Sequence, residues 1–384
     1  MIGLSADELV QLIRRVFAPR PDDHQLAILV DLPDAAVPDT ATWRERREMA
    51  SEWARLLAER APDLGLGAVN LVLYRNVRAN NADLPSSAVV HAPDRLPLAA
   101  DELTGDETTF ERVFATHQLL IAPTEFSATA PLKVAARVHR FRAATMPGFT
   151  AQMVPALKLN YEAIAARVCV LKTLLDESAR ADLTFRTPAG SAFLTIDLRH
   201  RTAHESTGLL HEPGTAGNLP SGEAYIVPYE GEIPGDPSRT AGELPVQFGD
   251  EVVVYRVIDN TAVEVLSRGA ASSTEAERLA SEPAYGNIAE LGLGVLAEFG
   301  VKPAGEILLD EKLGLHIAFG RSDHFGGQVG PSKFSSPDRV VHVDRVYIDS
   351  IQPLVRLASV DLGMPSGAAL QLIRDGKYAI CFED

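Results

Sequence analysis

The first half of the chain alternates short apolar runs with longer segments whose apolar residues recur at helical spacing. The alternating segments are 25–32, 40–61, 68–74, 117–126 and 132–141. This alternation is typical of α/β units, in which helices connect the neighbouring strands of a largely parallel sheet. We therefore predict a Rossmann-like α/β domain over residues 1–181.

Two further features bear on this domain. Prolines and aspartates, rather than closely spaced glycines, follow the first apolar run at residues 33–40. A dinucleotide site needs such glycines, so nucleotide binding is not expected here. Apolar residues then recur at helical spacing from Val154 to Ala179, which predicts one long helix near the end of the domain.

From residue 182 onward the sequence is rich in β-strand patterns. A hairpin is predicted around Ala189 and Gly190, and a second pair of strands flanks the turn at 258–262. One short helix is expected at 273–284. We predict a second, β-rich (α+β) domain over residues 182–384 whose strands are mainly antiparallel.

Composition argues against several classes of protein. Hydrophobic residues make up 46% and charged residues 23%, and no apolar run reaches the roughly 18 residues of a membrane span, so no membrane partner is expected. The formal net charge of -16 repels phosphate backbones and argues against nucleic acid as a partner. The start lacks the layout of a secretory signal, and Cys169 and Cys381 lie far apart in apolar contexts. We expect a cytoplasmic protein with buried thiols.

The segment "VVHVDRV" contains a histidine and an aspartate two positions apart, His342 and Asp344. In a strand, period-two alternation places both side chains on one face, about 7 Å apart along the strand, with Val341, Val343 and Arg345 on the other. This spacing suits two ligands of one metal ion or of neighbouring ions. An exposed polar face on a half-buried strand is the alternative.

Four more metal-capable side chains lie in the second half, each with an ordinary structural alternative. His316, in an apolar strand pattern, also fits a core histidine, and Glu311 in "DEK" also fits a solvated turn. Glu290 stands among small and apolar residues, where an ionised carboxylate needs a cation or hydrogen-bond donors. Glu223 follows Ser and Gly in ordinary turn chemistry.

Taken together, these residues make a stronger case than any one alone. Three carboxylates and two imidazoles are the typical ligand set of a two-metal hydrolytic site: Glu223, Glu290, Asp344, His316 and His342. Glu311 is then a spare carboxylate available as general base. Asp310 and Lys312, beside it, fit turn and surface positions.

The segments that hold these residues resemble a known family, the metallo-aminopeptidases typified by aminopeptidase T and aminopeptidase S. The resemblance rests, in order, on "NLPSGEAYIVP", "GNIAELGLG", "DEKLGLHIAFG" and "VHVD". It covers the second domain, whereas the first half matches only in its α/β character.

The resemblance implies that Glu223, Glu290, His316, His342 and Asp344 bind two divalent metal ions, with zinc, cobalt, manganese and magnesium all compatible with such ligands. Glu311 would be the catalytic carboxylate that takes a proton from water and passes it to the leaving amine. It also implies a homodimer whose β-rich domain carries the site.

Two departures from the family pattern stand out. Family members have a tyrosine shortly after the metal-binding histidine, where this chain has Asp323; an oxyanion donor is then missing or supplied elsewhere, for example by His324. An acid pair in the first motif is reduced to Gly222 and Glu223. Both changes leave room for altered substrate recognition.

The leading interpretation is a two-metal aminopeptidase or related amide hydrolase acting on a free-amine peptide or small amide. The alternative is a ring-cleaving dioxygenase with a single Fe(II), because His316, His342 and Asp344 also match a facial triad and resembling proteins open dihydroxypyridine rings. A triad has no use for Glu223 and Glu290, which favours the hydrolase. A non-catalytic binding module is the third possibility.

Overall fold

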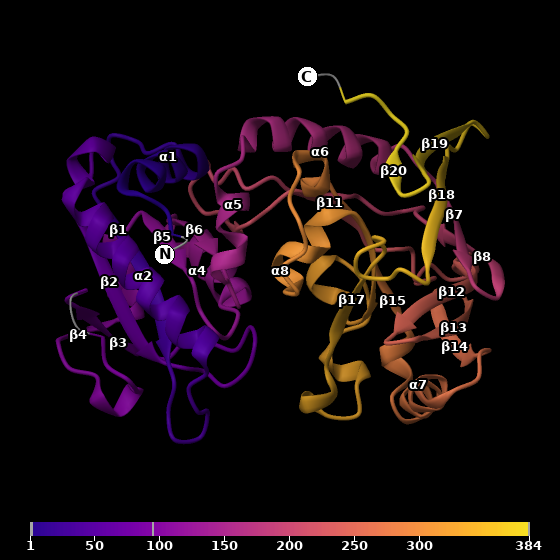
Figure 1. The fold of residues 1–384 in the computed structure, drawn as a ribbon, viewed down its shortest axis with the longest axis horizontal. Helices are drawn as coiled ribbons and strands as arrows, with labels where there is room; N and C mark the ends of the chain where they lie inside the picture. The colour runs from indigo at the N-terminus through magenta and orange to yellow at the C-terminus, as the bar shows by residue number, and fades with distance from the viewer. Residues whose placement is uncertain (1–2, 94–95, 383–384) are drawn as a thin grey trace. The chain divides into compact units, whose positions relative to one another are not determined.

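The computed structural model describes residues 3–93 and 96–382. The chain forms two compact units, each made of two stretches of sequence (Figure 1). One unit contains Met1–Ala165 and Ser206–Ser221, and the other contains Ala166–Glu205 and Gly222–Asp384. Each unit is built on its own sheets.

The first unit contains a seven-stranded sheet in the order β10-β6-β5-β1-β2-β3-β4. The strands are β1 Gln25–Leu32, β2 Ala68–Arg75, β3 Ser87–His91, β4 Asp106–Thr109, β5 Leu119–Ala122, β6 Arg142–Thr145 and β10 Ala216–Asn218. The five strands from β10 to β2 run parallel, whereas β3 and β4 are antiparallel additions at one edge. The parallel core predicted from the alternating pattern is confirmed.

Helices cover both faces of this sheet, namely α1 Ala6–Phe17, α2 Ala41–Glu59, α3 Phe110–Thr116 and α4 Thr129–His139. One face of the sheet packs Ala27, Leu29 and Val72 against α3 and α4. Local signals fix the helix starts: Ser5 and Glu8 form a capping box on α1, and the Thr40 hydroxyl caps α2.

The long helix predicted from Val154 to Ala179 is wrong in part, because the structure has two helices there. They are α5 Val154–Leu157 and α6 Tyr161–Asp176. The Asn160 side chain accepts hydrogen bonds from the N–H groups of Glu162 and Ala163, so it starts a new helix. Apolar periodicity alone did not reveal this cap.

The second unit contains an eight-stranded antiparallel sheet in the order β14-β13-β12-β8-β7-β18-β19-β20. Its strands are β7 Arg180–Thr187, β8 Gly190–Asp197, β12 Ala241–Phe248, β13 Glu251–Ile258, β14 Thr261–Val265, β18 Arg356–Gly363, β19 Ala369–Arg374 and β20 Lys377–Tyr378. Thr187 pairs with Gly190, and Asp259 and Asn260 form the next turn with positive φ. Both predicted hairpins are confirmed, and the short helix is α7 Ala270–Ser281.

A smaller sheet of the same unit has the order β17-β16-β15-β11-β9. Its strands are β9 His204–Ser206, β11 Glu223–Ile226, β15 Ile288–Gly294, β16 Leu315–Gly320 and β17 His342–Val346. The neighbours from β11 to β17 pair antiparallel. The short helix α8 Ile307–Asp310 precedes β16. Every candidate metal ligand lies on a strand of this sheet.

The prediction of two buried thiols is wrong, because Cys169 and Cys381 are both exposed. Helical geometry turns Cys169 away from the buried stripe of α6, which consists of Tyr161, Ile164, Val168, Leu171 and Leu175. The apolar neighbours of Cys169 in the sequence therefore did not indicate its environment. None of the described helices is both long and apolar enough to cross a membrane.

Candidate metal centre

One face of the small sheet gathers the predicted metal ligands. Residues directly opposite each other on antiparallel strands point to the same face. Ala318 of β16 lies opposite Glu290 on one side and Asp344 on the other, and Gly320 lies opposite His342. The period-two prediction for His342 and Asp344 is confirmed by this register.

A bulge in β15 orients Glu290. The register with β16 shifts between Ile288 and Glu290, so Ile288 lies opposite Phe319 while Glu290 lies opposite Ala318. A bulge of this kind redirects the side chain that follows it. It places Glu290 on the face that carries His316.

Small residues leave room for the functional groups on this face. Gly292 pairs with His316, and a Cβ atom at Gly292 would lie 2.0 Å from two atoms of the imidazole ring. The ring therefore lies across the backbone of β15, which only glycine permits. Ala318 lies between Glu290 and Asp344 across the sheet and has only a methyl group, so no large side chain separates the two carboxylates.

The ligand atoms form two groups that share Glu290. In the first, His316 Nε2 lies 3.2 Å from Glu290 Oε1 and 3.7 Å from Glu223 Oε2. In the second, His342 Nε2 lies 3.3 Å from both Glu290 Oε2 and Asp344 Oδ1. Within each group the ligand atoms all lie within 4.8 Å of one another. The structure thus brings all five predicted ligands together, with one carboxylate oxygen of Glu290 facing each group.

A backbone contact sets the orientation of His342. Its Nδ1 lies 2.8 Å from the carbonyl oxygen of Arg321. A carbonyl can only accept, so Nδ1 carries a proton, and Nε2 is left facing Glu290 and Asp344 as the atom that can bind a metal once its own proton is displaced. This is the tautomer that a metal ligand needs, held by the backbone contact typical of metal-binding histidines.

Buried polar atoms of the first group support a fit to a metal ion. Glu223 Oε2 has no hydrogen-bond partner among the described residues, although it is buried beside His316. Leaving such an oxygen unpaired is costly unless a cation takes the place of a donor. The oxygen and nitrogen donors present suit zinc, cobalt, manganese or iron.

Lys312 belongs to this site, and its interpretation as a surface residue is wrong. Only 1% of it is exposed, and its Nζ donates a hydrogen bond of 2.6 Å to Glu223 Oε1 and another to Glu311. Burial opposes its charge, but Glu223 and Glu311 raise the pKa of Lys312 above its usual range. Asp310 is also buried and accepts the N–H groups of Ala304 and Gly305.

Glu311 is the residue predicted to be the general base. It lies next to the first group because Lys312 donates hydrogen bonds to both Glu311 and Glu223. Burial raises its pKa to about 8, repulsion from Glu223 and Asp344 adds to this, and Lys312 opposes it. A carboxyl group with a pKa near the working pH exchanges protons efficiently with a reactant. The structure therefore gives Glu311 a suitable environment for proton transfer.

The two auxiliary candidates lie in a short turn after β16, and they differ in environment. Asp323 Oδ1 accepts a hydrogen bond of 2.5 Å from Arg321 Nε. The His324 ring lies 5.3 Å from that of His342. Burial, with the charges of His342 and Arg321, lowers the pKa of His324 to about 4, so this imidazole stays neutral.

Sequence reasoning missed two further residues near the site. Tyr225 lies two positions after Glu223 on β11, and the charges of Glu290 and Glu223 act on its hydroxyl. Glu230 accepts hydrogen bonds from Ser322 Oγ and Asn287 Nδ2 and so ties the turn after β16 to the sheet. The period-two rule applied to "GEAYI" would have placed Tyr225 on the face of Glu223.

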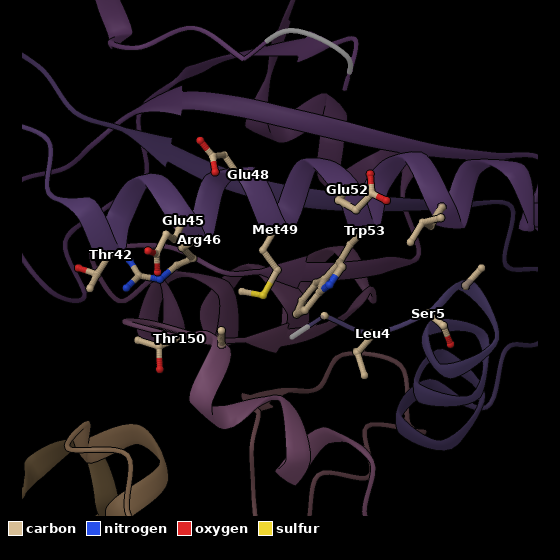
Figure 2. A pocket seen from close by; sticks show the side chains of 14 residues that line it. Leu4, Ser5, Thr42, Glu45, Arg46, Glu48, Met49, Glu52, Trp53 and Thr150 are labelled. Atoms are coloured by element: carbon tan, nitrogen blue, oxygen red, sulfur yellow. The ribbon is translucent and has the colours of Figure 1, made fainter. Parts of the chain in front are cut away.

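A separate cavity of about 810 Å³ lies in the first unit. Met49 and Trp53 of α2 point into it beside Leu4 and Thr150 (Figure 2). None of the potential metal-binding groups found among the described residues lies there. This cavity is therefore not part of the candidate centre.

Protons and divalent cations compete for the same atoms, so metal affinity is expected to depend on pH. Burial lowers the pKa of His316, but Glu290 and Glu223 reverse this and raise it to about 9; the pKa of His342 is also raised, by Asp344 and Glu290. Both rings hold protons at neutral pH that a metal must displace. Apparent affinity should therefore rise with pH, by about tenfold per pH unit for each displaced proton.

Competition titrations with zinc between about pH 6 and pH 9 measure this slope, and calorimetry in two buffers of different ionisation enthalpy counts the released protons. A His342→Gln variant should show a shallower slope, since one of the displaced protons is gone. A constant affinity across this pH range would contradict the prediction.

Comparison with known proteins finds likeness in structure but not in sequence. No known protein-family profile matches the chain, and no curated protein matches it. A 2,5-dihydroxypyridine dioxygenase from Pseudomonas putida KT2440 has a similar structure, with a TM-score of 0.61 and 15% identity over 98% of each chain. Wild-type AmpT from Thermus thermophilus has a TM-score of 0.56 and 16% identity, also over 98% of each chain.

At such low identity these matches show a shared fold. They support the resemblance to aminopeptidase T at the level of the fold, and they place the chain beside two enzymes of different chemistry. The fold is common to both chemistries, so the side chains of the site are what distinguish one reaction from the other.

Proposed function

We propose that this protein is a two-metal amide hydrolase of the aminopeptidase type, acting on a peptide or small amide with a free amine. The observation that carries the proposal is the position of Glu290, whose two carboxylate oxygens face two separate groups of ligand atoms. A carboxylate shared in this way is suited to bridging two cations.

The charge of the site supports the same proposal. When the protons of the site have been displaced, so that both imidazoles are neutral and all four carboxylates are ionised, Glu223, Glu290, Glu311 and Asp344 with the ammonium of Lys312 leave a formal charge of -3 in a buried setting. One divalent cation leaves this charge negative, whereas two make it positive. A positive centre favours the negative charge that develops on a carbonyl oxygen during hydrolysis.

Two divalent cations, when bound, polarise the scissile carbonyl and lower the pKa of a water molecule. Glu311 accepts a proton from the attacking water as the new C–O bond forms. It then donates that proton to the amine nitrogen as the C–N bond breaks, so that a carboxylic acid and an amine result. Lys312 holds Glu311 and Glu223 in position throughout.

The dioxygenase alternative uses His316, His342 and Asp344 around one iron. Among the described residues these three do not form one ligand group, because His316 belongs to the first group and the other two to the second. Glu290 lies between the groups and contacts both histidines. The geometry therefore favours the hydrolase, although the dioxygenase has the higher of the two TM-scores.

Metal content and activity, measured on the same protein purified without chelator, test the proposal. We expect about two metal ions per chain and hydrolysis of aminoacyl-p-nitroanilides in the presence of zinc, cobalt or manganese. A folded, metal-loaded protein that is inert on a broad panel of such substrates refutes the aminopeptidase. About one iron per chain, with oxygen uptake on dihydroxylated aromatics, would establish the dioxygenase instead.

A further inference from the structure

Tyr225 shares a row of the small sheet with a metal-ligand candidate. Tyr225 of β11 lies opposite Gly292 of β15, and Gly292 lies opposite His316 of β16. All three therefore point to the same face. Since Gly292 has no side chain and the His316 ring lies over its backbone, nothing of β15 separates the phenol ring from the imidazole.

Two aromatic contacts fix the position of the Tyr225 ring. His204 stacks on it, with ring centroids 5.2 Å apart and an interplanar angle of 26°, and Phe325 packs edge-on at 4.9 Å. His204 is itself held in place, because its Nε2 lies 2.9 Å from the carbonyl oxygen of Phe325. The ring is thus placed by packing and not by its hydroxyl.

The hydroxyl of Tyr225 makes no hydrogen bond to any described residue. The hydroxyl oxygen is also not among the buried atoms without a partner, so it is open to water or to a bound ligand. The charges that act on this hydroxyl are those of the site itself: Glu290, Glu223, Lys312 and Glu311. The group is therefore an unused donor beside the reacting centre.

We propose that Tyr225 is a catalytic residue, whose hydroxyl donates a hydrogen bond to the oxygen of the scissile carbonyl as negative charge develops there. This inference rests on the proposed hydrolase function. It assigns the role of oxyanion donor to β11, because Asp323, on the turn after β16, already pairs with Arg321. A fixed donor at the position of developing charge stabilises the transition state more than the ground state.

The test is Tyr225→Phe, which removes only the hydroxyl oxygen. We expect kcat to fall about 100-fold, in the range found when one oxyanion donor is removed, with KM, metal content and melting temperature little changed. Affinity for a phosphonate analogue of the tetrahedral intermediate should fall in parallel with kcat/KM, whereas affinity for the amino acid product should not. A residue with only a structural role would not produce this split.

Tyr161→Phe is the matched control, since it deletes the same atom from a buried tyrosine of the first unit whose hydroxyl donates to Ala156. It should leave kcat unchanged. If the wild-type protein hydrolyses amides and Tyr225→Phe keeps its kcat within twofold, the inference is wrong while the proposed function stands. If the metal-loaded wild-type protein hydrolyses no amide, the proposed function fails and the role of Tyr225 falls with it.

Discussion

Replacing Glu290 with alanine is expected to remove both metal ions, whereas replacing Glu223 or Asp344 should remove one. The reason is geometric: Glu290 contributes one oxygen to each group, while Glu223 and Asp344 each belong to a single group. Metal content after gel filtration, measured by mass spectrometry, should fall from about two ions per chain to near zero in Glu290→Ala and to about one in the other two variants.

The matched control is Glu277→Ala, which removes an exposed glutamate of α7. It should keep the full metal content. Circular dichroism on each variant separates loss of metal from loss of fold, because removing a buried carboxylate leaves two imidazoles without their partner. Retention of two ions by a folded Glu290→Ala variant would rule out a shared ligand.

Replacing Glu311 with glutamine is expected to reduce kcat by about 10²- to 10⁴-fold, the usual contribution of a general acid–base residue. Glutamine keeps the shape of the side chain but cannot carry a proton between water and amine. Glu223 remains bonded to Lys312 in this variant, so metal content should not change. Steady-state kinetics on metal-loaded protein measure the effect.

Asp310→Asn is the control for this substitution. Asp310 is the preceding acid, also buried, but its carboxylate is fully occupied by the N–H groups of Ala304 and Gly305. Its replacement should lower stability and leave kcat unchanged. A Glu311→Gln variant within tenfold of the wild-type rate would show that another group moves the proton.

Some of the site could be predicted from the sequence because it depends on local geometry. Period-two alternation placed His342 and Asp344 on one face, and the two hairpins of the large antiparallel sheet followed from turn residues between strand patterns. The five candidate ligands also lie together in the structure. These inferences needed only neighbours in the chain.

The rest of the site depends on pairings between strands that are distant from one another in the sequence. The bulge that orients Glu290 and the row from Tyr225 to His316 arise from the register of strands far apart in sequence, which no local pattern specifies. The prediction that Lys312 lies on the surface was wrong for the same reason. The residues "DEK" are typical of a solvated turn, and only the fold brings Glu223 next to Lys312. Apolar patterns in the sequence were also misleading at two positions. They indicated neither the helix cap at Asn160 nor the exposed position of Cys169.

The buried ammonium of Lys312 makes the net charges of the two ligand groups unequal. It already neutralises one oxygen of Glu223 in the first group, whereas Asp344 of the second group has no lysine or arginine partner among the described residues. If two divalent cations bind as proposed, we therefore expect the group of His342 and Asp344, whose carboxylate charge is less neutralised, to fill before the group of Glu223.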